Sequence, residues 1–144
     1  MKLTSKATLA LAAVPAALLL MAGPASALGG YDLTGSAGDI GGAWAHGTTW
    51  RTSDSRVHLN GELKDTVGDG KGAALKIHAV YADGGTRDEL VRNTSGNQAV
   101  VGIGEYNFAS SVRRIELQEC LLSRASDGSI YISSCAGGAQ VLYF

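Results

Sequence analysis

The chain has 144 residues, with 12 basic and 13 acidic side chains, 20 glycines, two cysteines and two prolines. A formal net charge of −1 provides no basic surface of the kind that binds nucleic acid, so we expect no nucleic-acid partner. The length fits one domain with a modest core, and the high glycine content argues against a mainly helical protein.

The first 27 residues have the organisation of a cleaved secretory signal. Two lysines precede an apolar stretch from Ala7 to Ala22, and small residues follow at 25–27. The stretch is short for a membrane span, and no second apolar run of spanning length follows. We therefore expect cleavage before Leu28 and a secreted, extracellular protein without a transmembrane anchor. Loss of Lys2 and Lys6 leaves ten basic residues against 13 acidic, a net charge of −3.

Residues 28–144 are expected to form a single β domain. The glycine-rich segment 28–42 has only scattered apolar residues and is expected to be a flexible arm. Beyond it, apolar and polar residues alternate with a period of two, as in strands with one buried face. The expected strands are 43–52, 57–64, 75–81, 88–92, 99–108, 112–122, 129–134 and 139–144.

Residues that accept a positive φ separate these runs, as tight hairpin turns require. Asn60-Gly61 falls inside an alternating run instead, so we interpret it as a bulge or a thin spot in a strand, with a short hairpin as the alternative. The pattern predicts an all-β protein, an antiparallel β-sandwich or small barrel-like domain with six to eight short strands. The side chains expected to face inward are Val57, Leu59, Leu63, Leu75, Ile77, Tyr81, Ile103, Ile115 and Leu117.

Cys120 and Cys135 are the only cysteines, and an exported chain favours a disulfide between them. Paired residues in a hairpin have a constant sum of residue numbers, and a turn at 127–128 that pairs Ser126 with Ser129 gives 255. The two cysteine numbers also add to 255, which places them opposite each other, where a disulfide fits. A redox-active pair is the alternative, but the Cys-x-x-Cys arrangement is lacking.

Two histidines, His58 and His78, occupy polar positions of two predicted strands. A register with a sum of 136 sets them opposite each other, where they could bind zinc or copper with Glu62 or Asn60 nearby. Two solvated histidines on an exposed face are the alternative, because neighbouring registers separate the pair and no third ligand is visible. Residues 65–70 resemble a calcium loop only loosely, and an ordinary Asx-Gly turn explains them better.

The predicted binding surface consists of Trp44, His46, Trp50 and Arg51. Flanking glycines leave this segment adaptable, and two tryptophans near a cation are typical of interface hot spots. Positions six apart on an extended strand share one face, so both rings could be presented together. The opposing interpretation is that this face points inward and both rings belong to the core.

No set of nucleophile, base and acid stands out, and no phosphate loop or dinucleotide fingerprint occurs, so no cofactor is expected. The glutamates on expected strands are Glu62, Glu105, Glu116 and Glu119. Nothing in the sequence selects two of them as a glycosidase pair. These features favour a secreted binding module for an unknown protein or carbohydrate ligand over an enzyme. The alternatives are a structural cell-surface protein and a small hydrolase, which would need a histidine in a pocket beside a carboxylate and a serine.

The chain resembles small secreted proteins of actinobacteria such as streptomycetes. The resemblance rests on the Ala-rich signal, the proline-free mature domain and the stretch that begins VHLNGELKDT at Val57 and ends IELQEC at Cys120. It covers most of the mature chain and implies export and a β fold. No motif within it transfers a site or an activity.

Overall fold

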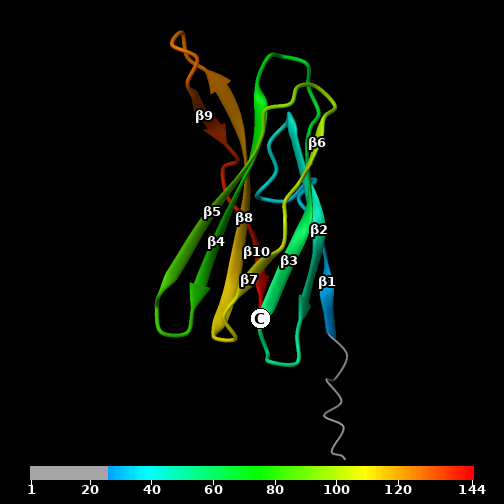
Figure 1. The fold of residues 1–144 in the computed structure, drawn as a ribbon, viewed down its shortest axis with the longest axis vertical. Helices are drawn as coiled ribbons and strands as arrows, with labels where there is room; N and C mark the ends of the chain where they lie inside the picture. Colours follow the sequence, from blue (N-terminus) through cyan, green and yellow to red (C-terminus); the bar gives the residue numbers. More distant parts are fainter. Residues whose placement is uncertain (1–25) are drawn as a thin grey trace, which may run out of the picture.

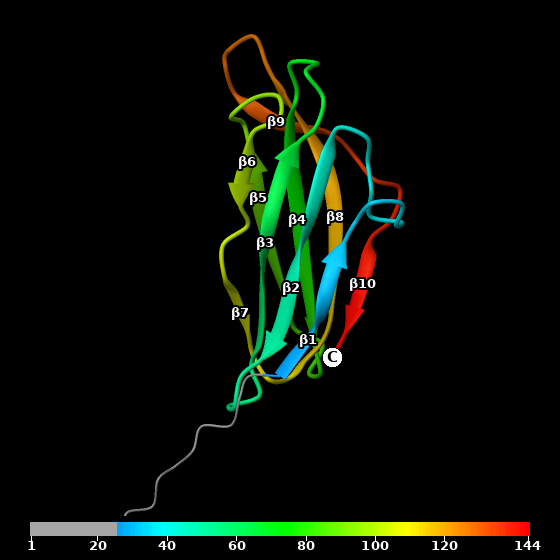
Figure 2. The same cartoon turned by 90° about the vertical axis from the view of Figure 1, so that its right-hand side faces the viewer.

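The protein is a sandwich of two antiparallel β-sheets (Figures 1 and 2). The computed structural model describes residues 26–144, so residues 1–25 of the predicted signal (1–27) lie outside the described residues, and its last two residues belong to the first strand. The first sheet contains β1 (Ser26–Asp32), β2 (Ala43–Arg51), β3 (Val57–Asp65), β6 (Val100–Gly102) and β7 (Tyr106–Phe108). The second contains β4 (Gly72–Tyr81), β5 (Thr86–Asn93), β8 (Val112–Arg124), β9 (Ile130–Cys135) and β10 (Gln140–Tyr143). The predicted all-β antiparallel sandwich is confirmed.

Each sheet has one edge that is divided between two short strands. In the first sheet, with the order β1-β2-β3, both β6 and β7 pair with β3. In the second, with the order β5-β4-β8, both β9 and β10 pair with β8. The described part of the chain has ten strands rather than six to eight. The reason is that β1 covers the end of the predicted signal and the start of the expected arm, and that 99–108, expected as one strand, is interrupted between β6 and β7.

The segment 28–42, expected as a flexible arm, is instead paired and packed. Strand β1 pairs with β2, and the chain then places Tyr31 and Leu33 in the core, where 4% and 0% of their surfaces remain exposed. The backbone N–H of Gly35 donates to the Asp39 carboxylate, which organises the following loop. The glycines of this segment therefore serve a folded connection between β1 and β2.

Tyr31 packs over a pair of glycines, Gly47 on β2 and Gly61 on β3, that lie opposite each other. Its hydroxyl donates to the carbonyl oxygen of Asn60 (3.0 Å). A Cβ atom on Gly61 would lie 2.6 Å from this hydroxyl and would also overlap the carbonyl oxygen of His46 on the paired strand. The register of β2 with β3 is unbroken here. Asn60-Gly61 thus belongs to a regular strand, which agrees with the interpretation as a thin spot. The missing side chain at Gly61 leaves the space that Tyr31 occupies.

The core lies between the two sheets and matches the predicted inward faces. Eight of the nine side chains expected to face inward are buried, and Tyr81 is half-buried against the same cluster. The alternation of the sequence therefore predicted the inner faces of both sheets well.

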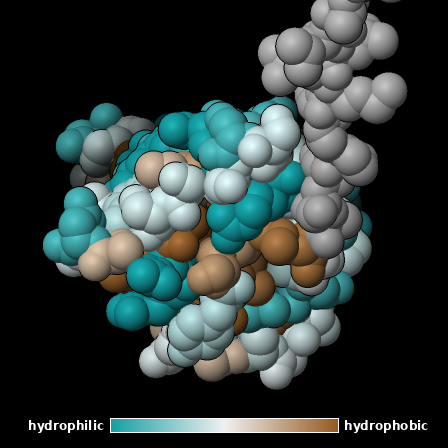
Figure 3. All heavy atoms as spheres, turned by 90° about the horizontal axis from the view of Figure 1, so that it is seen from below, coloured by the Kyte–Doolittle hydropathy of each residue, from teal (hydrophilic) through white to brown (hydrophobic). Residues whose placement is uncertain are grey.

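At the end of the sandwich where the described chain begins, hydrophobic residues are visible between hydrophilic ones (Figure 3). Leu28, on β1, is 44% exposed.

The connection between β3 and β4 passes from the first sheet to the second. Within it, Asp65 Oδ1 accepts a hydrogen bond from the N–H of Val67 (3.2 Å), and Asp69 Oδ1 accepts one from the N–H of Lys71 (3.0 Å). These contacts are Asx turns, which agrees with the turn interpretation of residues 65–70. Because the chain changes sheets here, β3 and β4 do not pair with each other.

The predicted disulfide between Cys120 and Cys135 is confirmed, and the two residues are partners in the β8–β9 register. The turn itself differs from the prediction, because the N–H of Ala125, rather than of Ser126, donates to Ser129 O (2.8 Å). This shifts the register by one residue near the turn. A bulge opposite the step from Leu121 to Leu122 restores the predicted register at the cysteines.

Loss of the disulfide is expected to lower the free energy of unfolding by roughly 3 kcal/mol, because it closes a loop of about 15 residues. Urea unfolding of the double variant Cys120→Ala/Cys135→Ala, compared with the oxidised protein, measures this difference. Reduced wild-type protein should show a similar loss. Equal stability of all three would mean that the bond adds nothing to the apolar cluster around it, which includes Ala74 and Leu122.

Glu119 is a fully buried carboxyl group that connects the two sheets. It lies on β8, and its Oε1 accepts a hydrogen bond from Ala45 N (2.7 Å), while its Oε2 accepts one from Ile40 N (3.1 Å). Burial raises the pKa of Glu119 to about 7, against the opposing effect of these hydrogen bonds, and the nearby Asp39 carboxylate adds to the rise. The carboxyl therefore accepts a hydrogen bond from a backbone N–H of β2 that lies beyond the end of β1 and has no strand partner on that side.

Candidate functional site

The outer face of the first sheet carries three of the four residues predicted to bind a ligand. Along β2, Ala43, Ala45 and Thr49 are buried, whereas Trp44 and Trp50 lie on the opposite face with His46 and are half-exposed. The two rings therefore lie outside the main core. Arg51 is not part of this group, because its guanidinium donates to Ser55 O (2.7 Å) in the turn between β2 and β3.

Trp44 is fixed by a stacked histidine and a hydrogen bond. Its ring is nearly parallel to that of His46, with centroids 4.1 Å apart and an angle of 6°. Its indole N–H donates to Asp32 Oδ1 (3.1 Å). Hydrogen bonds from Thr34, and then from Trp44, lower the pKa of Asp32, which keeps this acceptor charged. On the far side, His46 Nε2 lies 3.8 Å from Glu62 Oε2 on β3.

Trp50 repeats this arrangement at the other end of β2. Its ring stacks on His58 of β3, with centroids 5.1 Å apart and an angle of 18°. His58 is 8% exposed, and its Nδ1–H donates to Glu105 Oε1 (2.8 Å). Each tryptophan is thus paired with an imidazole that faces a glutamate. The two groups hold the indole rings in defined positions.

A shallow depression of about 380 Å³ lies beside β2, over the part of β3 that pairs with residues 46–48. It is lined by Asn60, Gly61, Glu62, Gly104 and Glu105. On its β2 side, the Thr48 hydroxyl donates to Asn60 Oδ1 (2.8 Å). The Glu62 and Glu105 side chains are each 59% exposed, so water reaches both carboxylates. The depression offers hydrogen-bonding groups beside the middle of β2, and the two indole rings, which do not line it, lie toward the two ends of that strand.

Sequence reasoning did not single out Glu105 as a partner of His58. Glu105 follows Gly104 in the link between β6 and β7, which the alternation placed inside one continuous strand. Gly104 has a φ of 84°, and a glycine is the residue that most easily interrupts a strand in this way. The glycines at 102 and 104 were the signal that could have located this break.

A chain of contacts from Glu105 through His58 to Thr52 has the order of a catalytic triad. His58 Nε2 lies 3.3 Å from Thr52 Oγ1. However, the single hydroxyl hydrogen of Thr52 has a stronger acceptor, since Oγ1 donates to Asp54 Oδ1 at 2.5 Å. Hydrogen bonds from Thr52 lower the pKa of Asp54, which keeps the acceptor ionised. The imidazole therefore does not receive the proton that nucleophilic activation requires.

The predicted metal pair is not assembled. His58 lies on β3 of the first sheet and His78 on β4 of the second, so no register sets them opposite each other. The physical reason is the connection at 66–71, which changes sheets instead of forming a hairpin. His78 Nδ1–H donates to Asp88 Oδ1 (2.6 Å) on the outer face of the second sheet. Among residues 26–144 no three side chains of His, Cys, Asp or Glu are grouped as metal ligands.

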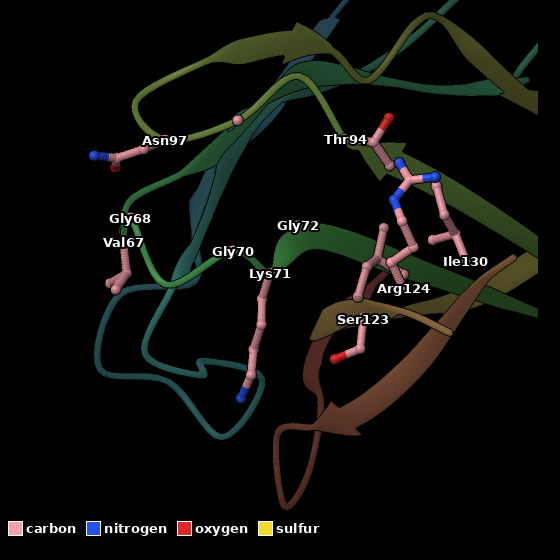
Figure 4. A pocket seen from close by; sticks show the side chains of 12 residues that line it. Val67, Gly68, Gly70, Lys71, Gly72, Thr94, Asn97, Ser123, Arg124 and Ile130 are labelled. Carbon is pink, nitrogen blue, oxygen red and sulfur yellow. The ribbon is translucent and has the colours of Figure 1, made fainter. Parts of the chain in front are cut away.

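A second cavity, of about 320 Å³, lies where the loops after β3 and β5 meet the β8–β9 hairpin (Figure 4). Its two cations are Lys71 and Arg124, which extend in opposite directions in Figure 4. Arg124 also donates to Gly128 O (2.9 Å) in its own hairpin. Because the two charges do not converge, the geometry offers no site for a single anionic group.

Comparison with known protein families, curated proteins and solved structures gives no significant match. Within the part of the chain that the structure describes, no helix has the length and apolar character to cross a membrane.

Proposed function

We propose that this protein is a secreted, non-catalytic binding module whose ligand surface is the outer face of the first sheet. The observation that carries the proposal is the pair of half-exposed tryptophans, Trp44 and Trp50, on one sheet face. Tryptophan is enriched among the residues that contribute most to binding, and here two partly exposed tryptophans share one sheet face. Export is supported by the organisation of residues 1–27 and by the disulfide.

The way each ring is held also supports binding. Trp44 is stacked on His46, Trp50 is stacked on His58, and a glutamate faces each imidazole. Side chains that are already ordered lose little conformational entropy when a ligand binds. The hydrolase alternative lacks comparable support, because Thr52 is engaged with Asp54.

Replacing both tryptophans by alanine is expected to abolish retention of the secreted protein on its ligand without unfolding the domain. Co-sedimentation with isolated cell walls and insoluble polysaccharides, together with capture of secreted proteins, measures retention. Tyr143→Ala is the matched control, because Tyr143 is an aromatic residue on the second sheet with 78% of its surface exposed. Retention of a folded Trp44→Ala/Trp50→Ala variant at the wild-type level would contradict the proposal.

Tryptophan fluorescence gives an independent measurement on the free protein. Iodide is expected to quench the emission, and the bound ligand is expected to protect it. Blue-shifted emission that iodide does not quench would place both rings in the core and remove the site. Release of soluble products from a polysaccharide during the same incubation would instead favour the hydrolase.

Intact mass of the protein recovered from the medium tests the export part of the proposal. We expect a chain that begins near Leu28 and whose two cysteines resist alkylation without reductant. A chain that keeps the first 27 residues, or that stays inside the cell, would contradict it.

A further inference from the structure

We infer that the ligand is an extended, uncharged polysaccharide that lies along β2 between Trp44 and Trp50. This inference rests on the binding role proposed for the outer face of the first sheet and gives that role a class of ligand. Three features of the face carry it: the separation of the rings, the charges near them, and the polar groups between them.

The separation of the rings indicates a polymer. Trp44 and Trp50 are six residues apart on one strand, which corresponds to about 20 Å at about 3.3 Å per residue. A single sugar ring cannot contact both indoles over this distance, whereas a chain of several sugar units can. The carbon-bound hydrogens on the face of a pyranose ring pack against aromatic rings, which have an electron-rich surface. A polysaccharide along the strand would therefore contact an aromatic ring at each end of the site.

The charges on the face argue against an acidic polymer. Glu62 and Glu105 line the depression with their carboxylates mostly exposed, and Asp32 lies beside Trp44. Lys64, opposite Trp44 on β3, is a cation on the same face, but the three carboxylates outnumber it. A polymer with uronate, phosphate or sulfate groups would therefore meet a net negative charge and be repelled. Each carboxylate also has a neighbour in the protein, namely His46, His58 and the Trp44 indole N–H. Binding of an uncharged chain leaves these pairs intact.

The polar groups between the rings match hydroxyl-rich ligands. Thr48 and Asn60 form one hydrogen-bonded pair at the centre of the face, and both side chains are exposed. The exposed oxygens of Glu62 and Glu105 accept hydrogen bonds from hydroxyl groups. The depression is shallow and open, so it fits the side of a long chain better than a compact small molecule.

The test uses isothermal titration of the secreted protein with soluble oligosaccharides of increasing length. The probes are cello-oligosaccharides and fully N-acetylated chitin oligosaccharides, with polygalacturonate as the acidic polymer. Affinity for one of the two uncharged series is expected to rise until the chain spans both tryptophans and then to level off. Polygalacturonate is expected to give no binding, and salt is expected to have little effect on the affinity for the uncharged chains.

Two single variants test the position of the chain. Trp44→Ala and Trp50→Ala are each expected to weaken binding at least tenfold for long oligosaccharides and to remove the increase of affinity with length. A change that only disturbed the structure would weaken binding equally at all lengths. Tyr143→Ala, on the other sheet, is expected to bind as the wild type does.

The outcomes separate this inference from the proposed function. One outcome would be that no oligosaccharide of either series binds, while cell walls or a secreted protein retain the wild type and not the double tryptophan variant. In that case the inferred ligand class is wrong, and the proposed binding surface is supported. If retention does not depend on the tryptophans, both fail. Binding of polygalacturonate as strong as that of the uncharged chains would overturn the charge argument and with it the class of ligand inferred here.

Discussion

Gly61→Ala is expected to destabilise the domain by about 4 kcal/mol or more, measured as the free energy of unfolding in urea. The added Cβ atom would overlap the carbonyl oxygen of His46 on the paired strand and the hydroxyl of Tyr31. The clashing oxygen belongs to the backbone of the paired strand, so rotation of a side chain cannot relieve the clash. The backbone itself cannot move aside without breaking the hydrogen bonds between the strands. Gly47→Ala, on the facing strand, is expected to have the same effect for the same reason.

Gly41→Ala is the matched control, because a Cβ atom there would meet nothing within 4 Å. If the Gly61 variant does not fold at all, Tyr31→Phe tests the same packing with a milder change. It removes the hydrogen bond to Asn60 and is expected to cost about 1 kcal/mol. Wild-type stability of Gly61→Ala would show that β2 and β3 can separate at this point, which contradicts the packing described above.

Stability is expected to fall as the pH rises from about 4.5 to about 7, because of Glu119. Burial raises the pKa of this group from 4.5 to about 7 in the folded protein, so the unfolded chain releases its proton first. Its contribution is fully present below pH 4.5 and is lost as the pH rises through 7. At about 1.4 kcal/mol per pH unit, the loss over this range is on the order of 3 kcal/mol.

Urea unfolding at a series of pH values measures this slope. Glu119→Gln cannot titrate and is expected to have a much flatter profile between pH 5 and 7, after allowance for other groups. Glu116→Gln is the control, because Glu116 lies on the same strand but is half-exposed and paired with Arg114. A Glu119→Gln profile as steep as that of the wild type would mean that another group causes the pH dependence.

Local patterns in the sequence predicted which face of each strand is buried, whereas long-range contacts decided which strands are neighbours. The alternation on β2 correctly put Trp44 and Trp50 on one face. The same reasoning correctly gave His58 a position opposite the core residues of β3, yet it paired His58 with His78 from the other sheet. The alternation is the same whether a connection makes a hairpin or crosses between sheets, so this partner could not be predicted.

The cysteine pairing was predicted correctly although the turn was not. The sum of residue numbers applies when no bulge intervenes, and here the one-residue shift at the turn and the bulge beyond it cancel. The burial of Tyr31 was missed for a different reason. The space that receives its ring comes from Gly47 and Gly61, which are distant from it in the sequence and whose meaning appears only when β1, β2 and β3 are side by side.

The division of each sheet edge into two short strands bears on how molecules of this protein behave when crowded. An unpaired strand edge is a template for another copy, and long, flat edges lead to aggregation. Here β6 with β7 and β9 with β10 offer only short unpaired runs, β5 carries four charged residues, and the pairing of β1 is interrupted by a bulge. Copies of the protein at high local concentration are therefore expected to stay separate rather than join their sheets into fibrils.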